Sequence, residues 1–326
     1  PYPMLVLTGG DCFERPDLVD LIEYAVGKGL HVSISPSVTP LFTRERVKAV
    51  QDAGVSVMSM SLDGGSAETH DAFRGFPGTF DRTIEACHML NELGMRFQLN
   101  TVFTAKNIHE APQMLKNAID LGAFMFYTFM LVPTGRGQHL DMLTPHERED
   151  VLHWLHDNST RIAIKTTEAP QYRRIAFQRE AVRQGKAAPA KHGELYHWLT
   201  KETHELLGEN IEEPRPPRTP LAINSGSGFA FIDHTGDVYP SGFLPIHCGS
   251  IKDTPFPQIY RESEVFRALR NPSGFEGKCG ACEFNHFCGG SRSTAYAMTG
   301  NYLASDPSCA HIPAGYTGEL PEGIER

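Results

Sequence analysis

The sequence lacks several features that would define a class of protein. It has no run of about eighteen apolar residues, so no segment is expected to cross a membrane. Acidic residues outnumber basic ones, 39 to 30, and the net charge of −9 disfavours a phosphate backbone as partner. No signal peptide opens the chain, and its seven cysteines follow no regular pairing pattern. These absences predict a cytoplasmic protein that binds neither nucleic acid nor membrane.

The chain also lacks an initiator methionine. It opens on Pro1-Tyr2-Pro3, and an apolar stretch typical of a buried strand follows at once. We therefore expect the sequence to be incomplete at its N-terminus. The 326 residues, of which 40% are hydrophobic and 21% charged, suffice for one large domain and a smaller one.

Four of the seven cysteines lie close together near the C-terminus. Cys279 and Cys282 form a CxxC pair, Cys288 follows after five residues, and Cys309 after a further twenty. Crowded thiolates need a metal or a covalent bond, because gathering negative charge out of water is costly. A structural zinc usually has two CxxC pairs, and a disulfide suits a small secreted domain. The uneven spacing favours an iron–sulfur cluster, with zinc and no metal as the alternatives.

The first 140 residues alternate between short apolar runs and amphipathic segments. Strands are expected at 4–7, 31–35, 55–61, 95–104 and 124–132, and helices at 16–28, 43–53, 79–93 and 107–121. Five strand–helix repeats predict parallel β/α units in a partial or complete β/α barrel. A doubly wound dinucleotide-binding sheet is disfavoured, because no GxGxxG follows the first strand.

Polar motifs follow these strands, at the ends where β/α barrels carry their chemistry. They are GGD at 9–11, SPS at 35–37, SLDG at 61–64 and PTGRG at 133–137. His70 and Arg74 are four residues apart, so a helix would place them on one face. Further along, Lys165, Arg173 and Arg174 either line a substrate cavity or form a solvated charged face.

The rest of the chain divides into two parts. Residues 144–184 read as helical with an interruption at 162–167, a further helix is expected at 195–207, and 212–220 reads as a linker. From 221 onward the strands are short, with a hairpin expected through 229–232 and 237–239 and a helix at 264–270. We therefore expect three parts: a barrel at 1–140, a helical extension and linker at 141–220, and a cysteine-rich domain at 221–326.

Several C-terminal motifs occur in one order: DHTGDVYPSGFLP from Asp233, then GSI, CGACEF, CGGSR and DPSC ending at Cys309. With the strand-end motifs, this order resembles radical SAM enzymes that carry a C-terminal SPASM or twitch domain. The resemblance is greatest to the branch that makes haem d1 and haem by the alternative route, and it spans nearly the whole chain. It implies an α/β fold, namely a partial (β/α)6 barrel missing its first unit, followed by a small SPASM/twitch domain.

The resemblance also implies cofactor sites. An auxiliary [4Fe–4S] cluster is expected on Cys279, Cys282, Cys288 and Cys309. S-adenosylmethionine (SAM) is expected at the strand ends, on Gly9, Gly10, Asp11, Ser35, Ser61, Arg74 and Asn100, with Asn100 taken to end the fourth strand. A second auxiliary cluster is not expected, because Ser241 stands where related proteins often carry a cysteine.

Radical SAM chemistry uses a CxxxCxxC loop whose [4Fe–4S] cluster cleaves SAM to a 5′-deoxyadenosyl radical, and this sequence contains no CxxxCxxC. We expect that second cluster on a preceding segment, so the sequence alone is not expected to cleave SAM. The resemblance implies an oxidoreductase acting on a haem precursor or a ribosomal peptide, with flavodoxin or ferredoxin as electron donor. Two other hypotheses stay open: a non-catalytic iron–sulfur electron-transfer or binding module, and a zinc-stabilised α/β protein.

Overall fold

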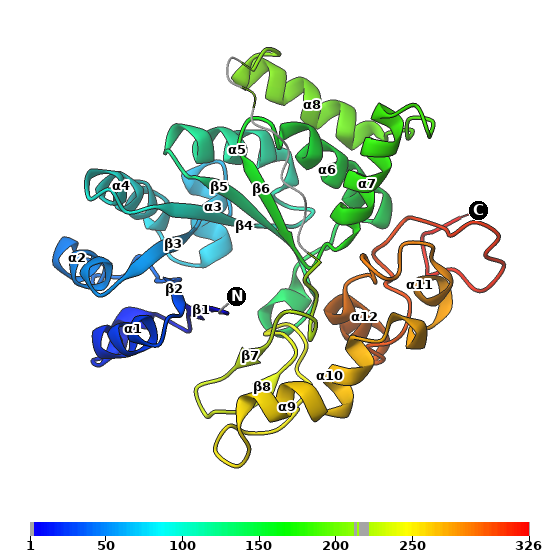
Figure 1. The fold of residues 1–326 in the computed structure, drawn as a ribbon. Helices are drawn as coiled ribbons and strands as arrows, with labels where there is room; N and C mark the ends of the chain where they lie inside the picture. Colours follow the sequence, from blue (N-terminus) through cyan, green and yellow to red (C-terminus); the bar gives the residue numbers. More distant parts are fainter. Residues whose placement is uncertain (1–2, 212–213, 215–221, 326) are drawn as a thin grey trace.

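A computed structural model describes residues 3–211, 214 and 222–325, except for the side chain of Arg136. Its centre is one six-stranded sheet in which every neighbouring pair is parallel and the strand order follows the sequence (Figure 1). The strands are β1 (Met4–Leu7), β2 (His31–Ile34), β3 (Val55–Ser61), β4 (Phe97–Phe103), β5 (Met125–Met130) and β6 (Ala163–Thr167). The strands described form an open sheet with β1 and β6 at its edges, as the predicted partial barrel requires.

Helices cover one face of this sheet, which we call the outer face (Figure 1). They are α1 (Leu18–Gly27), α2 (Arg44–Asp52), α4 (Thr79–Glu92), α5 (Ala111–Asp120), α6 (Pro145–Asn158) and α8 (Glu194–Leu207), while α3 (Ala67–Arg74) and α7 (Gln171–Arg183) lie near the strand ends. The 3-10 turns η1 (Cys12–Glu14), η2 (Ile108–Glu110) and η3 (Gly135–His139) complete the connections. Strands followed by helices that return along one face produce this parallel order.

Local sequence explains where several helices begin. Thr43, the first residue of the helix expected at 43–53, accepts a hydrogen bond from the Arg46 amide and caps α2. Thr144 and Glu147 form a reciprocal capping box at the start of α6. Inside the domain, Trp154 of α6 is fully buried and its indole N–H donates to Thr203 of α8 at 2.9 Å. This hydrogen bond therefore joins α6 to α8 within the helical layer over the outer face.

Two details of the sheet differ from the sequence-based predictions. The interruption expected between helices at 162–167 is the sixth strand, β6, which pairs along its length with β5. Asn100 does not end the fourth strand: β4 continues to Phe103, because the alternation of buried and half-buried residues runs on through that position. The linker predicted at 212–220 lies almost entirely outside the described residues.

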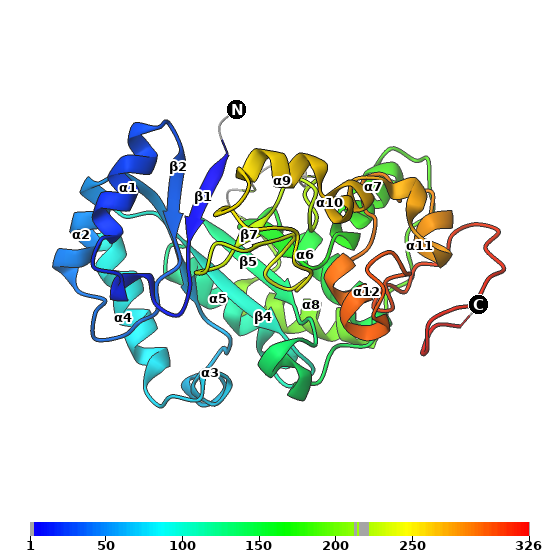
Figure 2. The same cartoon turned by 90° about the horizontal axis from the view of Figure 1, so that it is seen from below.

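The chain after residue 222 forms a smaller C-terminal unit. It contains the predicted hairpin, β7 (Phe231–Ile232) with β8 (Val238–Tyr239), and a separate small core around Val238, Ile259 and Phe266. Its helices are α9 (Phe256–Glu262), α10 (Glu264–Leu269), α11 (Gly277–Ala281) and α12 (Arg292–Thr299), with the 3-10 turn η4 (Pro272–Gly274). Figure 2 shows α11 and α12 on the side of the molecule away from α1 and α2. No helix among the described residues is both long and apolar enough to span a membrane.

Candidate functional site

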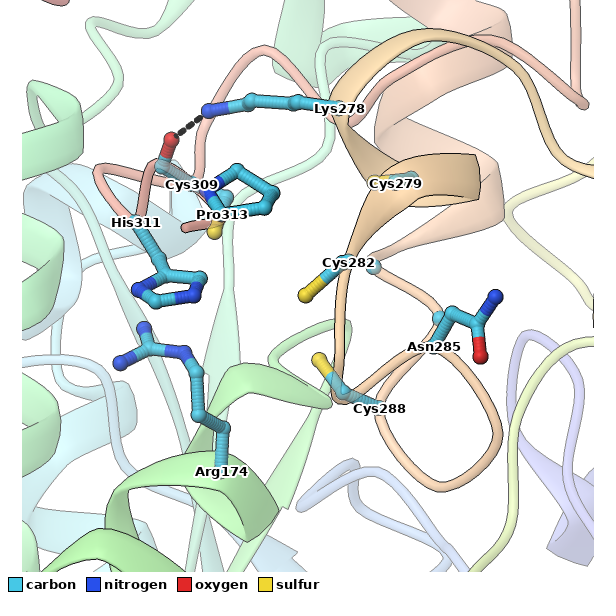
Figure 3. A pocket seen from close by; sticks show the side chains of 11 residues that line it. Arg174, Lys278, Cys279, Cys282, Asn285, Cys288, Cys309, His311 and Pro313 are labelled. Carbon is cyan, nitrogen blue, oxygen red and sulfur yellow. Dashed lines mark hydrogen bonds between the residues drawn. The ribbon is translucent and has the colours of Figure 1, made fainter. Parts of the chain in front are cut away.

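The four clustered cysteines line a single pocket in the C-terminal unit (Figure 3). Cys279 lies in α11, while Cys282 and Cys288 flank the loop that follows it. Cys309 comes from the segment after α12, and Figure 3 shows it on the opposite side of the pocket, with Arg174 of α7. The structure thus brings together the four predicted ligands, although Cys309 is thirty residues from Cys279 in sequence.

Glycines let the backbone wrap closely around this pocket. A Cβ on Gly280 would come within 2.0 Å of the Phe275 carbonyl oxygen. A Cβ on Gly290, which has a φ of +66°, would approach the Cys279 sulfur to 3.0 Å and Asp306 Cβ to 2.8 Å. Side chains at these positions would push the cysteine loop outward, so the loop geometry depends on glycine.

The spacing of the sulfurs bears on which metal group the pocket fits. A zinc ion with four thiolates and 2.3 Å bonds places its sulfurs about 3.8 Å apart. In the described part of the chain, no three of the four sulfurs lie within 4.8 Å of one another. A closer trio does occur, formed by Cys282, Glu283 and His311, but it includes only one of the four thiols. The four-cysteine pocket therefore fits a multinuclear cluster better than a single ion.

Burial disfavours the ionised form of these thiols. It raises the pKa of Cys282 to about 11, that of Cys288 to about 12 and that of Cys309 to about 11. At neutral pH such thiols keep their protons unless a cation replaces them. Metal binding here is therefore expected to release protons and to weaken as the pH falls.

Hydrogen-bond donors approach the sulfurs from several directions. Arg292 donates from Nη2 to the Cys279 sulfur at 3.4 Å, and the Asp306 amide donates to the same sulfur at 3.3 Å. The Phe284 amide donates to the Cys282 sulfur at 3.4 Å. Such bonds stabilise thiolates and tune the potential of a bound cluster.

Arg174 adds a buried positive charge at the pocket wall. Its guanidinium forms two hydrogen bonds with the carboxylate of Glu149 in α6, at 2.8 and 2.6 Å. Burial works against both charges, but their attraction outweighs it, so the pKa of Arg174 is raised and that of Glu149 is lowered. The sequence left open a solvated charged face for this arginine, and the structure instead buries it beside the cysteines.

Two buried acids join the sheet to the cysteine unit. Glu168, which follows β6, accepts hydrogen bonds from Ser291 at 2.6 Å and Ser293 at 2.9 Å. Asp306 accepts from Gln171 of α7 at 2.6 Å and from the Ser291 amide at 2.6 Å. The strand ends and the pocket are therefore held in a fixed relation by satisfied polar contacts.

The predicted SAM residues after β1 and β2 lie side by side. The Ser35 amide donates to Leu7 at the end of β1, and Ser37 donates to the carbonyl of Gly10 at 2.8 Å. The Asp11 carboxylate accepts hydrogen bonds from the Phe13 amide, the Ser37 amide and the Thr39 hydroxyl, at 3.1, 3.3 and 2.6 Å. Asp11 therefore shapes these two loops. Gly9 and Gly10 leave open space where a side chain would stand.

The SLDG motif after β3 is held by the helix that follows. The Asp63 carboxylate pairs with Arg74 and accepts from the Val102 amide, and its backbone amide donates to Nδ1 of His70 at 3.0 Å. Burial and the charge of Arg74 lower the pKa of His70 to about 4, so the imidazole stays neutral and accepts this bond. A Cβ on Gly64 would lie 2.4 Å from the His70 amide nitrogen, which explains the glycine. Arg74 is thus paired with Asp63 inside the protein, while 37% of its side-chain surface remains exposed to solvent.

The inner face of the sheet, opposite the helices, carries a row of polar and aromatic side chains. Ser61 is the register partner of Asn100, Asn100 of Tyr127, and Tyr127 of Lys165. Tyr127 packs against Phe129 with ring centroids 4.6 Å apart, and Phe129 lies 6.4 Å from Phe243 of the C-terminal unit. Sequence reasoning missed these aromatic residues, because MFYTFM in β5 reads as uniformly apolar.

The remaining cysteines lie elsewhere. Cys87 is fully buried in the main core, and burial raises its pKa to about 12. Cys12 is buried beside Asp11, and burial and that charge raise its pKa to about 12. Cys248 packs against the small core of the C-terminal unit and donates to the Ile246 carbonyl at 3.3 Å.

Comparison with known proteins shows which family this chain belongs to. The model of the radical SAM superfamily matches residues 2–118. The AdoMet-dependent heme synthase of Oleidesulfovibrio alaskensis is 39% identical over 315 residues, which are 95% of this chain and 75% of that protein. The chain belongs to the radical SAM superfamily. As a radical SAM protein it is an enzyme, and its family implies SAM and a [4Fe–4S] cluster as cofactors.

Other relatives of this radical SAM enzyme are more distant. The pre-heme d1 synthase of Dinoroseobacter shibae is 29% identical over 327 residues, covering 97% of this chain and 76% of that protein. The PqqA peptide cyclase of Rhodopseudomonas palustris is 26% identical over 318 residues, covering 94% and 73%. Among solved structures, Streptococcus suis SuiB bound to S-adenosylmethionine has a TM-score of 0.62 at 12% identity, covering 94% of this chain and 66% of that one. That likeness confirms the predicted radical SAM-type partial barrel.

Proposed function

We propose that this radical SAM enzyme modifies a haem precursor and uses an auxiliary [4Fe–4S] cluster in a SPASM-type C-terminal domain. Relatives named heme synthase support the substrate, because they share 39% identity whereas the peptide cyclases share 26% or less. A ribosomal peptide is the alternative substrate.

One observation carries the auxiliary cluster. Cys279, Cys282, Cys288 and Cys309, all among the described residues, line a single pocket, and no three of their sulfurs lie within 4.8 Å of one another, whereas a tetrahedral zinc would hold its sulfurs about 3.8 Å apart. Four thiolates would occupy all four iron corners of a [4Fe–4S] cluster, leaving no corner for SAM. The positive charge of Arg174 would offset part of the negative charge of such a cluster. The role of the cluster would be electron transfer or substrate support.

We further propose that the strand ends hold SAM. The contacts would come from Gly9, Gly10, Asp11, Ser35, Ser61, Arg74 and Asn100. Bound SAM and the family [4Fe–4S] cluster supply a 5′-deoxyadenosyl radical. The residues of this chain would position SAM: Gly9 and Gly10 admit it close to the backbone, and Asn100 offers amide hydrogen bonds from the inner face.

Each of the three parts of the chain would then have its own function. Residues 1–140 hold the SAM cradle, 141–220 the helical extension that also supplies β6 and α7, and 221–326 the auxiliary domain. An electron donor such as flavodoxin or ferredoxin, in the cytoplasm, would supply reducing equivalents. The buried contacts of Glu168 and Asp306 would keep the auxiliary pocket at a fixed distance from the strand ends.

The test uses the anaerobically purified holoenzyme with SAM and a low-potential reductant. The proposal predicts 5′-deoxyadenosine formation that depends on an added iron porphyrin with propionate side chains, together with a mass change in that porphyrin. Turnover that needs a peptide and ignores the porphyrin would contradict the haem assignment. A protein that contains one zinc and no sulfide would contradict the auxiliary cluster.

A further inference from the structure

Lys165 carries a positive charge on the inner face of the sheet. It is an exposed residue of β6, and its ammonium lies 4.4 Å from the centroid of the Tyr127 ring. Among the residues that the structure describes, no carboxylate oxygen comes within 4.0 Å of that ammonium, although salt bridges were found for many other lysines and arginines. The Tyr127 ring stabilises the ammonium by a cation–π contact but does not cancel its charge.

The acidic residue nearest to Lys165 in sequence does not pair with its ammonium. Glu168 follows Lys165 by three residues, but its carboxylate is buried and accepts hydrogen bonds from Ser291 and Ser293. Thr167, the next inner-face residue of β6, is hydrogen-bonded to the Tyr127 hydroxyl. The local polar groups are therefore satisfied among themselves, and the ammonium remains available to a ligand.

The surroundings of Lys165 suit a flat apolar body. Tyr127 and Phe129 present two neighbouring rings along β5, tilted by 38° to each other, and Phe243 of the C-terminal unit approaches Phe129 while 37% of its surface stays exposed. The Phe243 ring therefore leaves apolar surface open to solvent beside Phe129, as at surfaces that bind an apolar ligand.

The position of Lys165 also relates it to the proposed SAM site. Lys165, Tyr127 and Asn100 are register partners on three neighbouring strands. Two strand spacings separate Asn100 from Lys165, which is roughly 10 Å between their Cα atoms. A ligand anchored at Lys165 would extend along the row of aromatic rings toward the residues assigned to SAM.

We propose that Lys165 binds a carboxylate of the substrate, and that Tyr127, Phe129 and Phe243 pack against its flat apolar ring system. A tetrapyrrole with propionate side chains has both features. This inference rests on the proposed function and makes it specific: it names the side chain that anchors the substrate. An arginine could replace Lys165 in this role, whereas glutamine keeps a polar side chain that is one atom shorter and loses the charge.

Anaerobic absorbance titration with iron coproporphyrin III and with its tetramethyl ester tests the proposal. Lys165→Gln is expected to weaken binding of the free acid about tenfold, to leave binding of the ester, whose side chains carry no charge, unaffected, and to be rescued by Lys165→Arg. Lys48→Gln is the matched control, because Lys48 pairs with Asp52 on the helical side of the sheet and its loss changes the net charge equally. Tyr127→Leu is expected to weaken binding of both the free acid and the ester.

The outcomes separate the two levels of the proposal. Equal binding of the free acid by the wild type and Lys165→Gln would overturn the carboxylate anchor and leave the haem-precursor function standing. A wild-type protein that binds neither porphyrin would contradict the proposed function itself. Equal weakening of acid and ester by Lys165→Gln would show a packing role and would also overturn the inference.

Discussion

Removing Arg174 while leaving Glu149 in place should strongly destabilise the protein. The Arg174 side chain is 3% exposed, and it forms two hydrogen bonds with Glu149, whose side chain is 22% exposed. Arg174→Met keeps most of the volume and removes the charge. Glu149 is then left as a half-buried carboxylate, and among the described residues His153, 3.8 Å away, remains as a possible partner for its charge.

The expected cost follows from the burial of the pair. Breaking a buried ion pair from one side costs about 3–5 kcal/mol, because the remaining charge has lost its compensation. Glu149 keeps some access to water, so we expect the lower end, about 3 kcal/mol. The lowered pKa of Glu149 means that the pair stabilises the fold above the ordinary glutamate pKa. The effect of Arg174→Met should therefore shrink as the pH falls into the acid range, where Glu149 can take up a proton.

Urea denaturation of the metal-free protein, followed by tryptophan fluorescence, measures this cost, since Trp154 lies in the same helix as Glu149. The double variant Glu149→Leu/Arg174→Met should recover most of the loss, because replacing both partners removes the uncompensated charge. Arg179→Gln, which breaks a more exposed pair with Asp157, should cost less than about 1 kcal/mol. A loss below about 1 kcal/mol for Arg174→Met, or no recovery in the double variant, would refute the reasoning.

Two further predictions concern the loop after β3. Gly64→Ala should lower the free energy of unfolding by about 3 kcal/mol, since its Cβ would meet the His70 amide at 2.4 Å. Gly27→Ala in α1, where nothing lies within 4 Å, should be neutral or stabilise by up to about 1 kcal/mol; equal effects at the two sites would contradict the packing described. His70 has a folded pKa of about 4 against 6.5 when free, so the unfolded chain binds more protons between these values. Stability should thus fall as the pH drops from 6.5 to 4, and His70→Asn should flatten that profile; an unchanged slope would contradict a buried neutral imidazole.

Much of the fold was predictable because hydrophobic periodicity and caps agree along the chain. The strand at 55–61 and the helix capped by Thr43 were placed from such signals, and the structure confirms them. The strand β6 was missed as a strand because Ala163–Thr167 is short and lies between two helices, and its pairing with β5 is a long-range contact. Local sequence does not contain that information.

In the candidate site, too, local sequence predicted some features and long-range packing decided others. The four cysteines were identified from residue type and spacing, and they line one pocket. What the sequence did not show was the environment: Arg174 buried against Glu149, and Lys165 beside Tyr127 on the inner face. Both depend on which face of an element each residue occupies once distant segments pack. Charged residues in a run such as KTTEAPQYRR read as solvated until that packing is known.

The most direct test of the central claim is the iron and sulfide content of protein reconstituted anaerobically. Cys282→Ala/Cys288→Ala should contain about four irons and four sulfides per chain fewer than the wild type, with a matching loss of visible absorption. Cys87→Ala/Cys248→Ala removes two thiols outside the pocket and should keep the wild-type content. Equal iron and sulfide in both double variants, or one zinc per wild-type chain with no sulfide, would contradict an auxiliary cluster on Cys279, Cys282, Cys288 and Cys309.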